Sequence, residues 1–309
     1  MIWVSWREQR TETLIAVGIL AVVALLLVPT GIEMARAYDH DGIAACLGAQ
    51  PSFGCGDAVR SFQDRFNQIS NLLGWLTLLP GIVGVLLAAP FIAQFESGAY
   101  RLDWTQSITR RRWIAGKLGL SLGVAVLISL AFIALVTWWR TPLVHLNGRM
   151  ESSVFDSEGI VAVGYTLFAL AVALAVGVVW RRAVAALIVA FMAYFAVRLF
   201  VDVWLRQRLT PPLSATWPAR KDELAVLRHA WVISERPSDR FGNAVVLRIG
   251  DCPDGNLKAC FAAHAPGYIH AVYEPASRFW AMQLVEFGLF AGVAVALIAF
   301  SAWWIARRA

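Results

Sequence analysis

The sequence predicts an all-α polytopic membrane protein, and three observations lead to this fold class. Hydrophobic residues make up 59% of the 309-residue chain and charged residues only 16%. The mean hydropathy is +0.61, a value of membrane proteins rather than of soluble domains. Apolar runs long enough to cross the membrane as helices, which takes roughly 20 residues each, occur six times.

The six runs are too long for buried strands and too apolar on all sides for surface helices. They also lack the alternation of apolar and polar residues that strands of membrane barrels show. We predict spans at Thr13–Met34, Ile69–Phe95, Trp113–Trp139, Ile160–Trp180, Ala183–Trp204 and Phe279–Ala306.

Basic residues predict the orientation of these spans. With the amino terminus inside, five basic residues fall in the short outer segments, and eleven fall in the inner ones: Arg7, Arg10, Arg101, Arg110, Arg111, Arg112, Lys117, Arg181, Arg182, Arg307 and Arg308. The long segment 205–278 is left out because long translocated segments escape the positive-inside rule. We therefore expect a multi-pass plasma-membrane protein with both termini in the cytoplasm. The net charge of +6 then reflects topology, and no nucleic-acid partner is expected.

Four cysteines agree with this orientation. Cys46 and Cys55 fall in the first outer loop, and Cys252 and Cys260 fall in the long outer segment. Outer placement suits disulfides in an oxidising compartment, although four free thiols are the alternative. Pairing within each couple would contribute about 2.5–3 kcal/mol per bridge, but three connectivities remain open.

Two segments outside the spans carry their own patterns. In residues 1–12, Trp3 and Trp6 lie on one helical side, as in an interfacial helix or as aromatic-belt residues at the start of a span. Segment 205–278 shows a Pro-rich bend at 209–218, a helical pattern at 219–230 and strand patterns at 230–234 and 243–249. We expect a small mixed α/β external domain there, followed by the last span and a cytoplasmic tail in 279–309. The spans before it occupy 13–204.

Sequence motifs for nucleotide or metal chemistry are missing. The chain has no GxxxxGK[ST] loop, no GxGxxG after a strand and no HExxH, and its five histidines fit no ligand motif. No convergent acid, base and nucleophile appear at membrane depth. We expect no catalysis and no metal site in this chain, so an energy source would act on another subunit or be an ion gradient.

Charged residues within the spans are costly, at about 2.5–3.5 kcal/mol each on insertion scales. Arg198 and Asp202 are four residues apart on the fifth span, so they share a face and are placed to pair. Glu286 lies early in the sixth span. These charges have two interpretations: they form a structural salt bridge near the outer boundary of the membrane, or they contact a substrate.

A polar stretch, FESGAYRLDWTQSITRRRWIAGKLG at residues 95–119, separates the second and third spans. Tyr100, Trp104 and Ile108 recur every four residues and form one apolar stripe, while Gly98 permits a turn after the second span. We predict a short amphipathic helix within 95–112 on the cytoplasmic surface, where a partner can push it.

This stretch resembles the coupling-helix region of ABC-2-type permeases, the six-span subunits of ATP-driven exporters. The resemblance rests on Glu96, Ser97, Gly98, Tyr100, Arg101, Ser107, Arg110, Trp113 and Lys117. YEPASRFWAMQLVEFG, residues 273–288, resembles the entry into the last span of such permeases from high-GC Gram-positive bacteria. The cysteine-bearing first loop and the large external segment depart from the commonest form of the family.

The resemblance implies a permease that pairs with a second permease subunit, as a homodimer or heterodimer, and with cytoplasmic ABC ATPase subunits. ATP and Mg²⁺ would bind the ATPase, and no cofactor would bind this chain. The implied contacts with the ATPase are Glu96, Gly98, Tyr100, Arg101, Trp104 and Arg110. The implied pathway lies between the second and fifth spans, at Asn71, Trp75, Leu78, Phe191, Tyr194, Phe195 and Arg198. Aromatic lining suits an amphipathic or lipophilic substrate such as a drug, an antibiotic, a peptide or a lipid.

The alternative is a membrane receptor or assembly protein that does not transport. Its disulfide-stapled outer domain would bind a ligand, and its inner loop would recruit a partner. A stable complex with an ABC ATPase distinguishes the two hypotheses.

Overall fold

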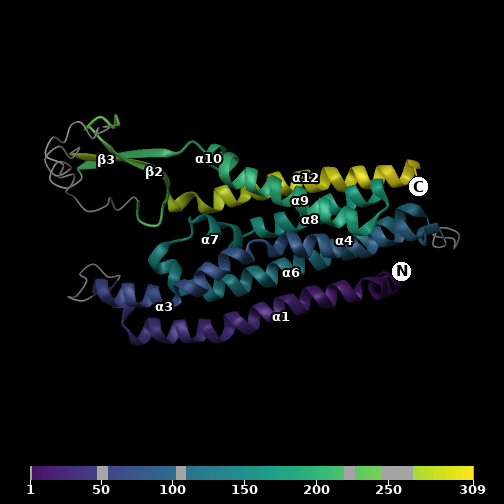
Figure 1. Cartoon of the computed structure of the whole chain (residues 1–309), viewed down its shortest axis with the longest axis horizontal. Helices are drawn as coiled ribbons and strands as arrows, with labels where there is room; N and C mark the ends of the chain where they lie inside the picture. The colour runs from purple at the N-terminus through teal and green to yellow at the C-terminus, as the bar shows by residue number, and fades with distance from the viewer. Residues whose placement is uncertain (1, 47–54, 102–108, 219–226, 245–266, 309) are drawn as a thin grey trace.

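In the computed structural model the chain forms an elongated bundle of helices with a small β-sheet at one end (Figure 1). The structure describes residues 2–46, 55–101, 109–218, 227–244 and 267–308. Both termini lie at the end opposite the sheet, where α4 ends and α6 begins. We call these two ends of the bundle the terminal end and the sheet end.

Among the residues that the structure describes, six helical segments have the length and composition of membrane spans, as the sequence predicted. They run over Ser5–His40, Ile69–Ser97, Arg112–Asn147, Val161–Trp180, Ala183–Leu209 and Ala276–Arg307. The corresponding elements are α1 (Ile2–His40), α3 with α4 (Cys55–Leu76, Leu79–Ser97), α6 (Arg110–Asn147), α8 (Val161–Trp180), α9 with η1 and α10 (Ala183–Phe200, Val201–Leu205, Arg206–Leu209), and α12 (Phe279–Arg308). The chain is therefore a mostly helical, multi-pass membrane protein.

The amino-terminal segment differs from the prediction of a separate interfacial helix. Residues 2–12 belong to α1, which continues without a break into the first span. Ser5 and Gln9 are buried against the bundle, whereas Trp3 and Trp6 are 68% and 44% exposed. The two indoles therefore flank the start of the span at the terminal end, as aromatic-belt residues do.

The second span is broken between α3 and α4. Pro80 occupies the first turn of α4, where its missing N–H would have no helical partner. At the end of α3 the Thr77 hydroxyl donates to the Gly74 carbonyl oxygen at 2.7 Å. The first part of α3 contains the polar segment 57–68 of the first loop, and its Phe62 and Phe66 pack against α1 and α6.

Helix α8 lies at the centre of the bundle, and 89% of its most apolar stretch is buried. It packs against α4, α9, α12 and α6. Small residues make this possible, because glycine and alanine let helix backbones approach closely. Gly84 of α4 touches the backbone of α8 at Thr166, and Gly177 of α8 packs on Ile92.

The loops of the sheet end are more structured than predicted. The segment 140–158, expected to be a short polar loop, contains the end of α6 and then α7 (Ser152–Ser157). Val154 and Phe155 of α7 are buried, so this helix is part of the core. In the first loop α2 (Ile43–Cys46) is joined to α3 by the disulfide Cys46–Cys55, the local pairing that we considered. Cys252 and Cys260 lie outside the described residues.

Three antiparallel strands form the sheet in the order β1-β3-β2. They are β1 (Leu213–Pro218), β2 (Trp231–Ser238) and β3 (Tyr268–Glu274), and the 3-10 turn η4 (Ala276–Arg278) leads from β3 into α12. β2 confirms the strand predicted at 230–234, whereas the predicted bend at 209–218 becomes a strand from residue 213. Most of the predicted helix at 219–230 and of the strand at 243–249 lies outside the described residues. Trp217 and Tyr273 belong to a small separate core under the sheet.

Candidate functional site

The predicted coupling segment begins at the terminal end of α4. This helix ends at Ser97, and Gly98 follows with a φ of 73°, a left-handed conformation that favours glycine. Tyr100 and Arg101 are again helical. Trp104 lies outside the described residues, and Arg110 is described only as the first residue of α6. The predicted turn at Gly98 is present.

Aromatic side chains anchor the start of this segment. Tyr100 is only 2% exposed and stacks on Phe95, with ring centroids 4.8 Å apart. Trp113 of α6 closes the cluster against Phe95 at 6.2 Å. Arg101 remains exposed and lies 5.9 Å over the Tyr100 ring. The cluster therefore joins the residues that follow Gly98 to α4 and α6.

Glu96 connects the same place to the fifth span. Its carboxylate accepts a hydrogen bond of 2.9 Å from the backbone N–H of Ala183, the first residue of α9. A carboxylate at a helix amino terminus satisfies a free N–H group and complements the helix dipole. Residues 96 and 183 are 87 positions apart, so this contact was not predicted. It joins the start of the coupling segment to α9.

Lys117 ties the amino-terminal helix to the same end. It is 8% exposed, forms an ion pair of 2.6 Å with Glu8 of α1 and donates a short hydrogen bond to Gln94 of α4. Its ammonium group also lies 4.5 Å from the Trp113 ring centroid. Helices α1, α4 and α6 therefore meet at one buried cation, whose cost in apolar surroundings is offset by these partners.

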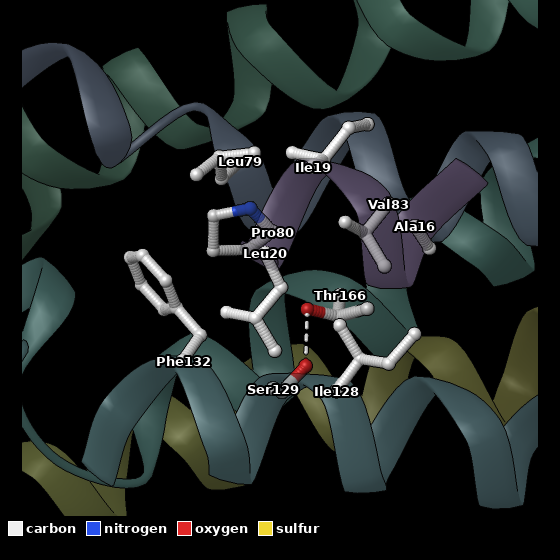
Figure 2. A pocket seen from close by; sticks show the side chains of 10 residues that line it. All are labelled: Ala16, Ile19, Leu20, Leu79, Pro80, Val83, Ile128, Ser129, Phe132 and Thr166. Atoms are coloured by element: carbon white, nitrogen blue, oxygen red, sulfur yellow. Dashed lines mark hydrogen bonds between the residues drawn. The ribbon is translucent and has the colours of Figure 1, made fainter. Parts of the chain in front are cut away.

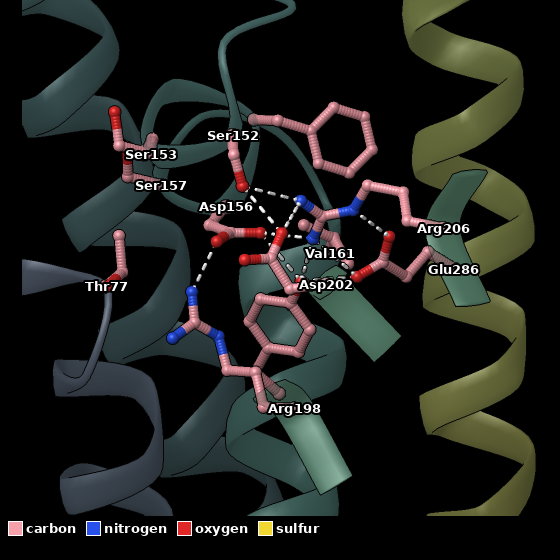
Figure 3. Close-up of polar contacts among 12 residues, drawn as sticks. Thr77, Ser152, Ser153, Asp156, Ser157, Val161, Arg198, Asp202, Arg206 and Glu286 are labelled. Carbon is pink, nitrogen blue, oxygen red and sulfur yellow. Dashed lines mark hydrogen bonds and ion pairs between the residues drawn. The ribbon is translucent and has the colours of Figure 1, made fainter. Parts of the chain in front are cut away.

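A second polar site lies between the helices at the sheet end (Figure 3). We call it the buried charge network. It combines side chains from α7, α8, α9, η1, α10 and α12: Ser152, Asp156, Tyr165, Arg198, Asp202, Arg206 and Glu286. Polar groups buried inside a membrane protein are expensive and mark functional sites.

Arg206 is the centre of the buried charge network. It is 2% exposed and forms ion pairs with Asp156 at 2.5 Å, with Asp202 at 2.5 Å and with Glu286 at 2.9 Å. Its guanidinium also donates to the hydroxyls of Ser152 and Tyr165. Four separate elements of the bundle are thereby held together by one side chain.

Arg198 completes the network through Asp156. The predicted pair of Arg198 with Asp202 is therefore wrong. Asp202, which lies in the π-helix η1, pairs instead with Arg206, the residue that follows η1. The reason is tertiary, because Asp156 is supplied by α7, 42 residues before Arg198.

The residues predicted to line a pathway fall into two groups. Tyr194 and Arg198 are buried inside the bundle, and Tyr194 packs on Gly81 of α4. Trp75 and Phe195 are 73% and 39% exposed on the bundle surface. Asn71 is likewise exposed, while Leu78 and Phe191 are half-buried. The chain alone does not gather these seven side chains around one space.

A pocket does open between α1, α4, α6 and α8 (Figure 2). Its volume is only about 20 Å³, and its lining comprises Ala16, Ile19, Leu20, Leu79, Pro80, Val83, Ile128, Ser129, Phe132 and Thr166. The lining is apolar except for Ser129 and Thr166, whose hydroxyls share a hydrogen bond of 2.7 Å. A space of this size is a narrow apolar gap between the helices, with room for little more than one water-sized group. None of the predicted pathway residues lines it.

A separate buried carboxylate lies at the sheet end between the third and fourth spans. Glu158 is 2% exposed and lies 3.3 Å from Arg140 and 3.5 Å from Arg149. Within the described part of the chain, neither of its carboxylate oxygens accepts a hydrogen bond. Burial raises the pKa of Glu158 from 4.5 to about 7, and the two arginines only partly counteract this.

This pKa predicts a pH-dependent stability. The folded state binds the Glu158 proton more tightly than the unfolded state, so the contribution is full below pH 4.5 and is lost as the pH rises to about 7. It is on the order of 3 kcal/mol. Unfolding of detergent-solubilised protein should lose this slope in Glu158→Gln. An identical slope in wild type and variant would contradict the assignment.

The helices and the polar groups between them define a polytopic helical membrane protein. More specifically, residues 17–206 match the family model described as ABC-2 membrane transporter related, and because this is more than half of the chain, the chain belongs to that family. Comparisons with curated proteins and with solved structures gave no match. Permeases of this family normally work in the membrane with an ATPase subunit. Among the described residues, no group of three potential ligands could hold a metal ion.

Proposed function

We propose that the chain is the permease subunit of an ATP-driven exporter in a bacterial plasma membrane. It pairs with a second permease subunit and with cytoplasmic ATPase subunits, which bind ATP and Mg²⁺ and hydrolyse the nucleotide. The terminal end faces the cytoplasm. The observation that supports this best is the hydrogen bond from Ala183 to Glu96, because it joins the coupling segment to the fifth span of a family member.

The geometry suggests how nucleotide binding could move the bundle. A push on residues 95–112 reaches α4 and α6 through the Tyr100 cluster and reaches α9 through Glu96. Helices α9, η1 and α10 continue one another from Ala183 to Leu209. The far end of this rod carries Arg198 and Arg206 into the buried charge network. A tilt of the rod at the terminal end therefore acts on the sheet end, which gives alternating access a mechanical route.

The substrate class follows from the apolar surfaces of the bundle. Trp75 and Phe195 present large exposed aromatic rings, and the pocket in Figure 2 is apolar and lies beside the break in the second span. Aromatic and aliphatic linings bind amphipathic or lipophilic molecules. We expect such a molecule to move along the face shared by the second and fifth spans of two permease subunits.

Reconstitution with the ATPase tests this function. The measured quantity is ATPase activity of the complex in lipid vesicles, for wild type, Glu96→Ala and Arg101→Ala. Both variants should assemble but lose stimulation roughly tenfold, since a charge-assisted contact of about 1.5 kcal/mol is removed. Glu33→Ala is the matched control, because Glu33 is an exposed carboxylate of α1 paired only at the surface with Arg65.

Two outcomes count against the proposal. If the purified chain forms no complex with an ABC ATPase, the exporter assignment fails and the receptor hypothesis gains. If Glu96→Ala and Arg101→Ala both keep wild-type stimulation, these side chains do not couple the ATPase to the bundle.

A further inference from the structure

The hydroxyl of Tyr165 lies between two buried carboxylates, those of Asp156 and Glu286. Its oxygen is 2.9 Å from Oδ1 of Asp156 and 2.5 Å from Oε1 of Glu286. All three side chains are at most 3% exposed. A phenol has one hydrogen and an ionised carboxylate has none, so the hydroxyl can donate across only one of these contacts. The other contact is one hydrogen short.

Arg206 does not supply the missing hydrogen. Its Nε donates to Glu286, its Nη1 faces Ser152 and Asp202, and its Nη2 faces Asp156, Glu286 and the Tyr165 oxygen. The five N–H hydrogens of a guanidinium are therefore all engaged. Because Nη2 has two hydrogens for three oxygens within its reach, Arg206 has no hydrogen to spare for the direct contact between Tyr165 and Glu286.

The charges of the network also indicate that one hydrogen is missing. Three carboxylates, Asp156, Asp202 and Glu286, share the two guanidiniums of Arg198 and Arg206. Asp202 is 31% exposed, whereas Asp156 and Glu286 are buried. An unbalanced negative charge in a buried site is costly, and one bound proton removes it.

The groups that face this site come from every element packed around it. They are Asp156 of α7, Tyr165 of α8, Tyr194 and Arg198 of α9, Asp202 of η1, Arg206 of α10 and Glu286 of α12. The π-helix η1 is itself a rare element that occurs mostly at functional sites. It carries Asp202, and Arg206 follows it as the first residue of α10.

We propose that the buried charge network is a proton-binding site. One proton, taken up from water, is shared among Tyr165, Glu286 and Asp156 and completes the hydrogen bonds between α7, α8 and α12. When it leaves, the close contact of Tyr165 with Glu286 becomes a repulsion between oxygens, and α12 is loosened from α8. The site extends beyond the exporter function and stands without it, because it rests only on contacts within this chain.

Infrared spectroscopy of the purified full-length chain tests the proposal. A protonated carboxyl group has a C=O stretch that is well separated from the bands of ionised carboxylates. Glu158→Gln is used as the background, because the pKa of Glu158, about 7, would add a second such band near neutral pH. In this background we expect a carboxylic-acid band at pH 7. It should be lost when Glu286→Gln or Asp156→Asn is added.

Tyr165→Phe provides a test that keeps the charges and the ring. The acid loses the hydroxyl oxygen next to it, so its C=O band should shift in frequency. Tyr38→Phe is the matched control, because Tyr38 of α1 packs on Phe62 in a separate hydrophobic cluster and its loss should leave the band in place.

Two results of these measurements would overturn the proposal. A folded Glu158→Gln protein without a carboxylic-acid band at pH 7 would overturn the proposal, whatever the other variants do. A band that persists unchanged in Glu286→Gln, in Asp156→Asn and in Tyr165→Phe would overturn it as well. If the two carboxylate variants do not fold, the test rests on Tyr165→Phe. A shifted C=O stretching frequency supports the proposal, and an unchanged frequency overturns it.

Discussion

Arg206→Ala is expected to destabilise the chain by about 3–5 kcal/mol, so that little folded protein is recovered from membranes. The guanidinium is 2% exposed and holds Asp156, Asp202 and Glu286 together. Without it, three carboxylates face one another with only Arg198 nearby. Thermal unfolding of the solubilised protein, together with its recovery as a single species on size-exclusion chromatography, measures the loss.

Arg208→Ala is the matched control for this variant. Arg208 is two positions away, exposed to solvent, and stacks on Trp204 with its guanidinium 4.1 Å from the ring centroid. Exposed contacts of this kind contribute about 0.5–1 kcal/mol. Acidic pH should partly rescue Arg206→Ala, because protonation relieves the repulsion between the carboxylates. Equal unfolding temperatures for the Arg206 and Arg208 variants would contradict the central role of Arg206.

Gly84→Ala is expected to destabilise the bundle by about 2–3 kcal/mol, since added atoms in a well-packed core cost this much. A Cβ atom at Gly84 would lie 2.3 Å from the carbonyl oxygen of Thr166 and 2.9 Å from the backbone nitrogen of Leu170. These are backbone atoms of α8 and cannot rotate away. Helices α4 and α8 must therefore separate, and the midpoint of thermal unfolding should fall.

Gly123→Ala tests whether the effect comes from packing. Gly123 is an exposed residue of the long helix α6, and nothing lies within 4 Å of a Cβ atom built there. The same substitution should be neutral or stabilising by up to about 1 kcal/mol, because alanine favours a helix over glycine. A similar loss of stability in both variants would show that the close approach of α4 to α8 is not the cause.

The two polar sites of the bundle are linked by α9. Glu96 holds its first residue at the terminal end, and Arg198 and Arg206 hold its continuation at the sheet end. In the proposed exporter the protonation state of the network would therefore influence how easily a movement started by the ATPase reaches the far side. A double-mutant cycle that combines Glu96→Ala with Tyr165→Phe can measure this link.

The sequence alone determined the number and positions of the spans. Membrane thickness fixes the length of an apolar helix, so hydropathy and length suffice for this inference. Local spacing also predicted the turn at Gly98, which is present, and it left the Cys46–Cys55 pairing as one of three connectivities, which the structure shows. Arg198 and Glu286 were noticed because charges within spans are rare.

The tertiary structure decided which polar groups meet. Asp156 lies in a segment that the sequence marks as a polar loop, and Arg206 lies just past the predicted end of the fifth span at Trp204. Neither could be assigned to a buried site before α7 and α10 were seen to pack against α12. Glu96 likewise meets Ala183 across 87 positions. Hydrophobicity is a property of one segment and adds up along it, whereas an ion pair depends on where two distant segments come together in space.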